Sequence, residues 1–421
     1  MALTPEPDLA LAERLFAALA ARSRDGEGVT REAYGPGERM AHALVGEAAA
    51  ALGLEVRPDH AGNLHMTLPG RDRAAKRIVL GSHLDSVRQG GNYDGAAGVL
   101  AGLAVAAGLR SAEIVPRCDL TVLAIRAEEA GSWFPFSFPG SRAALGILPP
   151  DALGVRRLDT GRTLAEHMRE EGFDPEAVRA GRRSLGPDTV AAFVELHIEQ
   201  GPVLDAAEIP VGIVTATPGS RRFRAARVQG EYGHSGAVPR ALRRDAAIAA
   251  AELAFRLDEA WAELEAEGHA LVCTFCVLAT GEAAGFTKIA GEARFQLDLR
   301  STDPDSVDAL RGALDRLVAE IAARRGVTFE LGPESGAEGC AMDAGVQAGL
   351  KAAARSLGIP ERSMPSGGGH DAASFIAAGI PAGMLFVRNQ NGSHNPREAM
   401  RREDFAAACA VLTRWVMQEA G

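Results

Sequence analysis

The feature that most constrains this chain is a repeated pattern in its first half: short apolar runs that end in histidine or acidic residues. Residues 78–83 read IVLGSH, 120–129 read LTVLAIRAEE and 191–201 read AAFVELHIEQG, while residues 95–109 between the first two runs have the composition of a helix. Strands that alternate with helices predict an α/β sheet with helices on both faces. In such sheets, ligands gather at the carboxyl ends of the strands, where these polar residues lie.

The pattern changes at about residue 217. Residues 217–331 give the order strand, helix, strand, strand, helix, which suits a small sheet with helices on one face. After residue 332 the α/β pattern returns, with an apolar run at 379–387 and a helix at 402–418. We therefore expect an α/β mixed-sheet domain made of residues 1–216 plus 332–421, interrupted by a smaller α+β domain at 217–331.

Charge and composition exclude several classes of function. The 421 residues carry a formal net charge of -10, so nucleic acid, which requires a basic surface, is not an expected partner. No apolar run has the length of a membrane span, and the N-terminus lacks the basic start and apolar stretch of a secretory signal. We expect a cytoplasmic protein without a membrane partner.

The five cysteines are too scattered for a disulfide framework. Cys273 and Cys276 form a single CxxC within LVCTFCVLAT, and a zinc ribbon needs a second pair at similar spacing. This segment is interpreted as a buried strand.

Candidate chemistry begins at His83, which ends the first apolar run. Asp85 lies two residues further on, and Asp94 follows a glycine pair and precedes a helix. A histidine and an aspartate at two loop ends above one sheet can converge on a cation, and Asp85 can orient His83 by a hydrogen bond. The alternative is a loop histidine with a helix N-cap aspartate, and these residues alone leave both readings open.

Glu128 and Glu129 form an adjacent acidic pair at the end of the second apolar run. Neighbouring side chains on extended backbone point to opposite sides, so one carboxylate can bind metal while the other faces a substrate. A solvated acidic pair is the commoner reading of two isolated glutamates. Here the apolar run directs the pair into the predicted site region.

Three further histidines lie at the ends of elements, beside glycine or acidic residues. His197 lies in VELHIEQGP, His394 in the loop segment NGSHNPRE, and His370 in the glycine-rich SGGGHDAA. Each one alone is more often structural, but together they favour a metal site. The remaining histidines are interpreted as helical or surface residues without acidic or glycine partners and are not expected to bind metal: His42, His60, His65, His167 and His269.

Taken together, these blocks resemble the dinuclear zinc hydrolases of the aminoacylase and glutamate carboxypeptidase superfamily. Within it they are most similar to the group of N-carbamoyl-L-amino acid hydrolases, allantoate amidohydrolases and β-ureidopropionases. The resemblance spans residues 81–398 and is carried by GSHLDSVRQGGNYDGAAGV, RAEEAGSWF, ELHIEQGPVL, GEYGHSGAVPRALRRDA, FQLDLRS, SGGGHDAA and GSHNPRE.

The resemblance implies two divalent metal ions in each subunit. One would be held by His83, Asp94 and His197, and the other by Asp94, Glu129 and His394, with Asp94 bridging. Imidazole and carboxylate ligands suit zinc first, and manganese, cobalt or nickel would also fit.

The resemblance further implies that Glu128 is the general base and that His234 stabilises the oxyanion. Substrate contacts carried over by position are Gln200, His234, Thr287, Arg300 and His370. Alternation in FQLDLRS places Arg300 on a polar strand face, where an ordinary surface charge is equally expected. From the residues alone, His234 is equally well read as a turn histidine. Relatives are expected to dimerise through the domain at 217–331, which also acts as a lid, and to place the matching histidine in the neighbour's active site.

The chain departs from the pattern of the group at four positions. Trp133 replaces a common arginine, and Thr287 stands where asparagine is usual. Arg240 stands where the group usually has the dipeptide Pro-Met, and Gly368 replaces alanine. Of these, we expect Trp133 and Thr287 to alter contacts around the substrate.

The sequence therefore predicts a metal-dependent amidohydrolase that cleaves the ureido C–N bond of an N-carbamoyl-L-amino acid or a similar ureido acid bearing a carboxylate. Allantoate amidohydrolase and β-ureidopropionase are the near alternatives. A dipeptidase or aminoacylase is disfavoured by His197, because the peptidase branches usually have a carboxylate there. A catalytically silent binding protein is disfavoured by Glu128, which such a protein would not need.

Overall fold

The computed structural model describes residues 5–129 and 131–421, and the chain divides into two compact units. The first unit runs to Thr215 and resumes at Met342, and the second comprises Ala216–Ala341. The expected mixed α/β fold is confirmed. Among the described residues, no helix is long and apolar enough to cross a membrane.

The first unit is built on a large mixed sheet. Its strand order is β18 (Glu361–Met364), β8 (Val211–Val214), β19 (Ala382–Val387), β7 (Val190–Ile198), β5 (Arg77–His83), β6 (Leu120–Ile125), β4 (Leu64–Leu68) and β3 (Glu55–Pro58). The central strands β19, β7, β5 and β6 are parallel, so their carboxyl ends lie at the same edge of the sheet.

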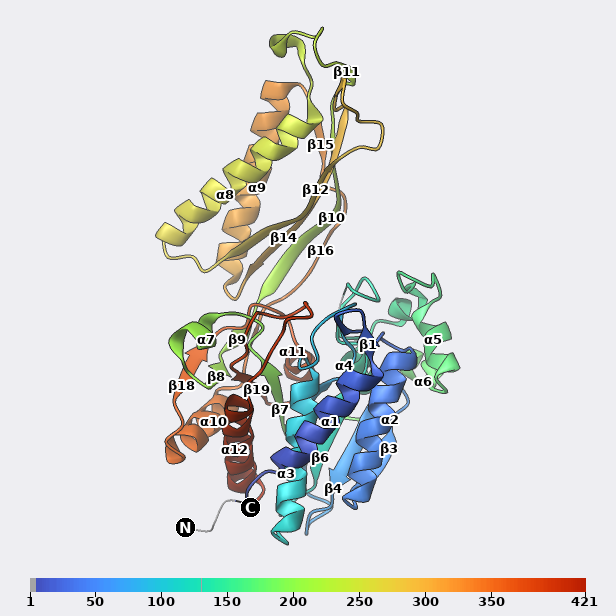
Figure 1. Cartoon of the computed structure of the whole chain (residues 1–421), viewed down its shortest axis with the longest axis vertical. Helices are drawn as coiled ribbons and strands as arrows, with labels where there is room; N and C mark the ends of the chain where they lie inside the picture. Colours follow the sequence, from blue (N-terminus) through green and yellow to red (C-terminus); the bar gives the residue numbers. More distant parts are fainter. Residues whose placement is uncertain (1–4, 130) are drawn as a thin grey trace. The chain divides into compact units, whose positions relative to one another are not determined.

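The main hydrophobic core lies between one face of this sheet and a layer of helices (Figure 1). This layer contains α1 (Leu9–Arg22), α2 (Pro36–Ala51), α3 (Ala96–Ser111), α10 (Ala344–Ser356) and α12 (Arg402–Glu419). Every residue of α3 from Ala96 to Leu109 is buried, which explains why this helix is apolar on all sides.

The other face of the sheet carries the polar residues because side chains alternate along each strand. In β7, Val194 and Leu196 enter the main core, so Glu195 and His197 point to the opposite face. There α11 (Asp371–Ala377) packs against β7, with the Phe193 and Phe375 rings stacked at 3.8 Å between centroids. Smaller helices of the first unit are α4 (Pro139–Ala144), α5 (Leu164–Glu170), α6 (Pro175–Arg179) and α7 (Val203–Ala207).

The second unit is an antiparallel sheet with two helices on one face. The sheet has the order β12 (Val272–Thr280), β14 (Glu292–Ser301), β10 (Gly219–Gln229) and β15 (Thr328–Glu330), and β16 (Glu334–Ala337) also pairs with β10. The helices α8 (Ala246–Ala266) and α9 (Pro304–Arg325) cover the apolar side chains of β14, namely Phe295, Leu297 and Leu299.

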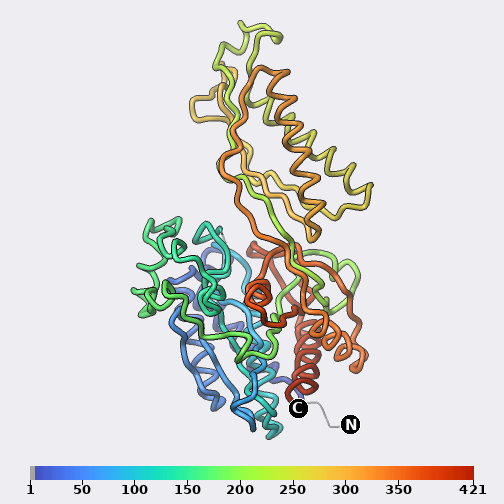
Figure 2. Tube along the Cα trace, turned by 180° about the vertical axis from the view of Figure 1, so that it is seen from behind, coloured from blue at the N-terminus to red at the C-terminus, as the bar shows by residue number. Residues whose placement is uncertain are grey.

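Two sequence expectations about the second unit differ from the structure. The chain returns to the first unit at Met342 rather than at 332, because β16 still pairs with β10, as the adjacent orange and green segments of Figure 2 show. The segment LVCTFCVLAT was expected to be buried, but β12 is the terminal strand of the sheet order and is largely exposed. Cys273 and Phe275 pack against the core of their own unit, but Val272, Val277 and Leu278 are exposed and are not explained by that core. Cys273 and Cys276 are free cysteines.

Candidate metal centre

The sequence-predicted ligands come together at the carboxyl edge of the parallel strands. His83 ends β5, Glu129 follows β6, His197 lies near the end of β7, His394 lies in the loop after β19, and Asp94 precedes α3. Potential ligand atoms of His83, Asp94 and His197 all lie within 4.8 Å of one another, and the same holds for Asp94, Glu129 and His394. Asp94 thus belongs to both groups.

The two oxygens of Asp94 face different histidines. Oδ1 lies 3.1 Å from Nε2 of His197 and 3.5 Å from Nε2 of His83, and those two Nε2 atoms are 3.4 Å apart. Oδ2 lies 3.4 Å from Nε2 of His394, which is also 3.5 Å from Oε2 of Glu129. One carboxylate can therefore serve two neighbouring cation positions.

The orientation of two imidazoles leaves their Nε2 atoms available as ligands. Nδ1 of His83 lies 3.1 Å from the backbone oxygen of Asp85, and Nδ1 of His197 lies 2.9 Å from the backbone oxygen of Ile198. A carbonyl oxygen accepts only, so Nδ1 carries the proton in each ring and Nε2 presents a lone pair. This is the arrangement by which proteins orient metal-binding histidines.

Buried oxygen atoms also fit a cation. Within residues 5–129 and 131–421, Oδ1 of Asp94 and Oε1 of Glu129 are buried and have no hydrogen-bond partner. Such atoms are costly unless a charge-compensating group binds them. The imidazole and carboxylate donors suit a divalent transition metal, so the residues present fit the metal ions that the sequence implies.

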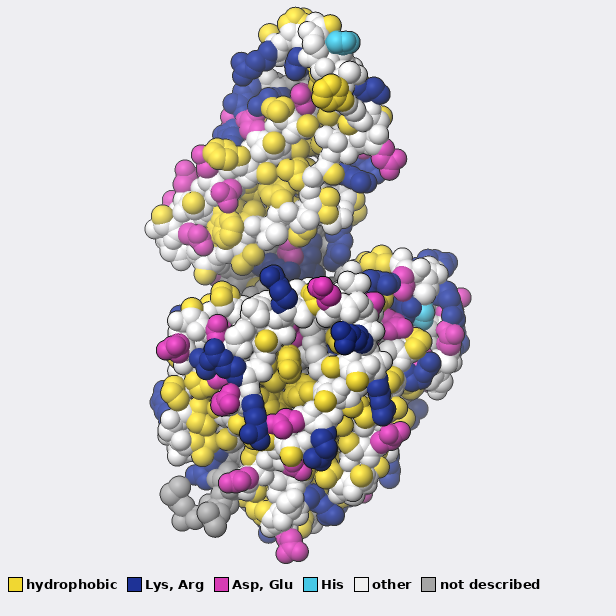
Figure 3. Space-filling model, viewed as in Figure 1, with side chains coloured by type: hydrophobic (Ala, Val, Ile, Leu, Met, Phe, Trp, Pro, Cys, Tyr) yellow, Lys and Arg dark blue, Asp and Glu magenta, His cyan; other side chains and the backbone are white. Residues whose placement is uncertain are grey.

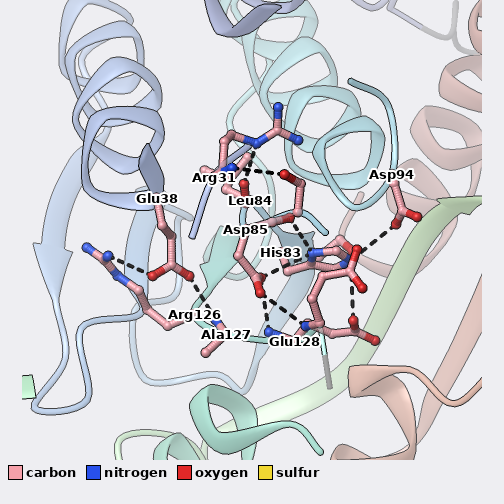
Figure 4. A network of polar contacts seen from close by, with 12 residues as sticks. Arg31, Glu38, His83, Leu84, Asp85, Asp94, Arg126, Ala127 and Glu128 are labelled. Atoms are coloured by element: carbon pink, nitrogen blue, oxygen red, sulfur yellow. Dashed lines mark hydrogen bonds and ion pairs between the residues drawn. The ribbon is translucent and has the colours of Figure 1, made fainter. Parts of the chain in front are cut away.

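Asp85 fixes the acidic pair beside this centre (Figure 4). Its Oδ1 accepts the backbone N–H of Glu128 at 3.0 Å and lies 3.3 Å from Nδ1 of His83. Its Oδ2 accepts the backbone N–H of Glu129 at 3.1 Å. The residue expected to orient His83 thus also holds both glutamates.

Glu128 lies beside the ligand groups without belonging to them. Its Oε2 is 3.7 Å from Nε2 of His83, and its Oε1 is 4.0 Å from Nδ1 of His370. Burial raises the pKa of Glu128 well above its ordinary value, although the charge of His83 opposes the shift. A raised carboxyl pKa suits a group that must both accept and return a proton.

Two of the predicted substrate contacts lie against the metal ligands. Nε2 of Gln200 donates to Oδ2 of Asp94 at 2.8 Å, and Gln200 has a left-handed backbone with φ of 65°. His370 is buried at the start of α11, with its ring 4.5 Å from that of His197, and Glu195, His197 and His370 form a further group of potential ligands.

The other predicted substrate contacts belong to the second unit. His234 is exposed on β11 (Gly233–His234), which pairs with β13 (Lys288–Ile289), and the backbone oxygen of Thr287 accepts the N–H of Ser235 at 2.9 Å. Arg300 lies on β14 and donates to Oδ2 of Asp298 at 2.7 Å from Nη2. The structure therefore brings His234 and Thr287 together, and it places Arg300 on the face of β14 opposite the helices.

Trp133 is 1% exposed, and its Nε1 donates to the backbone oxygen of Ser86 in the loop after His83, so its effect on substrate contacts stays a prediction. One expectation about another residue was wrong. His65 was expected to lack an acidic neighbour, but its Nε2 lies 3.6 Å from Oδ2 of Asp59. None of the histidines dismissed as ligands joins a potential metal group in the part of the chain that the structure describes.

Several buried polar residues of the site were missed by the sequence reasoning. Oε1 of Glu398 accepts the backbone N–H groups of Tyr93 and Asp94, and its Oε2 accepts Oγ of Ser393 at 2.5 Å. Glu398 lies inside the block GSHNPRE, so its closeness to His394 was a usable signal. Arg31 and Glu38 are also fully buried near the site, but nothing in their local sequence indicates this.

Comparison with known proteins identifies the family. Residues 79–418 match the peptidase family M20/M25/M40. The chain belongs to this family. It is 38% identical to the N-carbamoyl-L-amino acid amidohydrolase of Geobacillus stearothermophilus over 93% of each chain, and 32% identical to the allantoate amidohydrolase of Bacillus subtilis over 93% of this chain and 92% of that protein.

A solved relative supports the same assignment. An amidase of the hydantoinase/carbamoylase family from Burkholderia multivorans superposes with a TM-score of 0.88 at 29% identity, covering 99% of each chain. The predicted resemblance and the predicted hydrolase class are confirmed. The family is metal-dependent, in agreement with the candidate ligand groups of the first unit.

The three histidines that are candidate metal ligands, His83, His197 and His394, have raised pKa values. Contact with Asp94, together with the charge of Glu129, raises the pKa of His394 to about 9. Burial disfavours the charged form of His83, but Glu128, Asp85 and Asp94 outweigh it and raise the pKa well above the ordinary value. These shifts favour the protonated imidazole in the metal-free protein, whereas a histidine that binds a metal must be neutral.

We expect metal binding at pH 7 to release protons. Titration calorimetry of metal-free protein in buffers of different ionisation enthalpy measures this number directly. Release should fall as the pH rises through about 9, the pKa of His394. His394→Ala should release fewer protons than the wild type. A heat of binding that is independent of the buffer would contradict the assignment.

Proposed function

We propose that the chain hydrolyses the ureido C–N bond of an N-carbamoyl-L-amino acid. Water adds to the ureido carbon, the bond to the amino-acid nitrogen breaks, and the products are the free amino acid and carbamic acid. Carbamic acid then decomposes to ammonia and carbon dioxide. Allantoate and N-carbamoyl-β-alanine are the alternative substrates, since they present the same ureido group and a carboxylate.

The observation that carries this proposal is the position of His197 in the group that shares Asp94. In the peptidase branches of the superfamily, the resemblance implies a carboxylate there. Three relatives named N-carbamoyl-L-amino acid amidohydrolase are 32–38% identical to this chain. A solved relative, AtUAH, is described in complex with (S)-hydroxyglycine, a small α-substituted acid, at 28% identity and a TM-score of 0.83.

We assign one metal position to His83, Asp94 and His197 and the other to Asp94, Glu129 and His394. Bound divalent cations lower the pKa of water and polarise a carbonyl oxygen. Zinc is the first choice for these nitrogen and oxygen donors, with manganese, cobalt or nickel as alternatives. Gln200, which donates to Asp94, would hold the shared carboxylate in place.

Glu128 is the residue that moves protons in this proposal. It is buried beside the ligand groups, and its carboxylate is not needed to complete either of the two assigned positions. It would accept a proton from the attacking water and deliver it to the leaving nitrogen. His370, 4.0 Å from Oε1 of Glu128, would contact the substrate beside it.

His234 is proposed to stabilise the developing oxyanion. Its Nδ1 accepts the backbone N–H groups of Gly236 at 3.1 Å and Ala237 at 3.2 Å, so the ring proton lies on Nε2. An Nε2–H group is a donor suited to an oxyanion, and removal of one such donor costs about 3 kcal/mol of transition-state stabilisation. Thr287 would add a contact beside it.

Arg300 is proposed to bind the substrate carboxylate. A guanidinium offers two parallel N–H donors that match a carboxylate. Asp298 already accepts from Nε and Nη2 of Arg300, at 3.1 Å and 2.7 Å, which holds the guanidinium in one orientation.

We further propose that the protein is a cytoplasmic homodimer formed through the second unit, which also acts as a lid. All five cysteines are free, as expected in a reducing compartment. Hydrophobic side chains gather on the face of the second unit that carries α8 and β12 (Figure 3). The exposed large apolar residues of these two elements are Ile248 and Phe255 on α8, and Val272, Val277 and Leu278 on β12. An apolar edge strand beside exposed apolar helix residues is typical of a symmetric interface.

A substrate panel tests the proposed activity. With added Zn²⁺ or Mn²⁺, the protein should release ammonia from N-carbamoyl-L-amino acids, more slowly from allantoate, and not from dipeptides or N-acetyl amino acids. Release of a free amino acid without ammonia from the acetyl substrates would indicate an aminoacylase. Absence of turnover on every substrate would favour the binding-protein alternative.

The adjacent glutamates should give different phenotypes. Glu128→Gln should retain both metal equivalents but lose turnover by about 100- to 10,000-fold, because it removes the proton-transfer group. Glu129→Gln should lose metal affinity, and activity should return when metal is added in excess. Elemental analysis and steady-state kinetics measure both. Exchanged phenotypes would reverse the two assignments.

The dimer proposal predicts a mass of twice the 44.0 kDa chain by light scattering. Leu278→Glu on β12 should give monomers, because it buries a charge in the interface. Val115→Glu is the control. Val115 lies in the first unit, and its exposed fraction, 52%, is similar to the 47% of Leu278. A monomeric wild type would refute the interface.

If His234 acts across the dimer, mixing inactive Glu128→Gln with inactive His234→Ala should restore activity. After subunit exchange, each hybrid has one intact site and one site with both lesions. Proven exchange without recovery would place His234 in its own subunit's site or outside catalysis.

A further inference from the structure

Four consecutive backbone N–H groups lead from the end of β6 into the acidic pair, and each donates to a side chain. Asn63 Oδ1 accepts from Arg126 at 2.9 Å, and Glu38 Oε1 accepts from Ala127 at 2.8 Å. Asp85 accepts from the next two residues, the glutamates. The path of residues 126–129 is therefore fixed by side chains from three other segments.

This path includes a strained residue. Ala127 is buried and has a φ of 57°, in the left-handed region that residues with a Cβ atom rarely adopt. Such a conformation persists only where surrounding contacts hold it, and it is found most often at functional sites. The N–H of Ala127 is the group that Glu38 accepts.

Glu38 lies on α2, in the layer of helices rather than among the strand ends, and it is fully buried. Figure 4 shows its contacts with Ala127 and with Nη1 of Arg126, the latter 3.0 Å from Oε2. Oε2 also accepts the N–H of Tyr34 at 2.7 Å. All three partners are donors. A glutamine side chain fails in either orientation, because its NH₂ group would face Ala127 in one and Tyr34 with Arg126 in the other.

Folding stability alone does not account for Glu38. Burial raises the pKa of Glu38 to about 7 although Arg126 opposes the shift, so the charged carboxylate is costly at this position. Buried ion pairs are often no more stable than apolar groups of similar volume. Glu38 instead supplies acceptors to two residues of the segment 126–129, Arg126 and Ala127, and a third acceptor contact to Tyr34.

We infer that Glu38 is a positioning residue: through Ala127 and Arg126 it fixes the backbone from which Glu128 and Glu129 reach their separate partners. Glu128 Oε2 faces His83, and Glu129 Oε2 faces His394. A displacement of this backbone moves both carboxylates together. The kinetic part of this inference rests on the proposed activity, whereas the part concerning metal affinity rests only on the proposed ligand assignment.

Glu38→Gln tests the inference by two measurements on the full-length protein. Titration of the metal-free variant with Zn²⁺ should show one of two equivalents weakened by about 10- to 100-fold, the usual effect of losing a residue that orients a ligand. On N-carbamoyl amino acids, kcat should fall by a similar factor with KM nearly unchanged. A residue that only stabilises the fold would lower the melting temperature and leave both quantities unaltered.

Asp119→Asn is the matched control. Asp119 is a buried carboxylate directly before β6, where it accepts the N–H of Gly70 and pairs with Arg73, so it resembles Glu38 at the other end of the same strand. This variant should lose thermal stability but keep kcat and both metal equivalents. If Glu38→Gln does not fold, Glu38→Asp replaces it. Aspartate keeps the negative charge that pairs with Arg126, but its side chain is one methylene shorter, so its oxygens lie further from Ala127. Zinc affinity and kcat are then measured in the same way.

Unchanged zinc affinity and kcat in a folded Glu38 variant would overturn the inference. Equal losses in the Asp119 control would also overturn it, because they would show a general effect of β6 stability. If the wild type released no ammonia from any ureido substrate, the proposed function would fail. The zinc titration would still decide the role of Glu38.

Discussion

Asp94 presents one carboxylate oxygen to His83 and His197 and the other to His394, at a place where Glu128 and Glu129 are also buried. So many acidic groups repel one another unless positive charge lies among them. In the metal-free protein the histidines take up protons to supply it. Two divalent cations would supply it instead and displace those protons, so the same arrangement couples metal binding to pH.

The surrounding fold also contributes positive charge and hydrogen-bond acceptors. The guanidinium of Arg31 is fully buried, donates to the backbone oxygen of Leu84 at 2.6 Å, and lies in the field of Asp85, Asp94 and Glu398. Three buried carboxylates around the centre accept backbone N–H groups of segments that carry a candidate ligand or the base. Asp85 and Glu38 hold the segment of the glutamates, and Glu398 holds that of Asp94. The positions of the candidate ligands thus depend on a second layer of acidic residues.

Features that depend on local sequence patterns could be predicted, whereas features that depend on contacts between residues far apart in the chain could not. The strands ending at His83, Glu129 and His197 were predictable, because apolar runs followed by polar residues mark strand ends in an α/β sheet. The exposure of β12 was not, because an apolar run has the same composition whether its partner is the core of its own chain or another surface. The burial of Trp133 was not predictable either, because its position beside Ser86 depends on a contact between residues 47 positions apart.

By itself, the sequence determined the mixed α/β class, the interruption by a smaller unit and the residue types that gather at one edge of the sheet. Local periodicity and the chemistry of each side chain are sufficient for these. The tertiary structure decided which Nε2 atoms face each oxygen of Asp94, and that Glu38, 89 residues from Ala127, holds the backbone of the acidic pair. These features depend on contacts between segments far apart in the chain, and packing of the sheet against α2 and α3 is what brings those segments together.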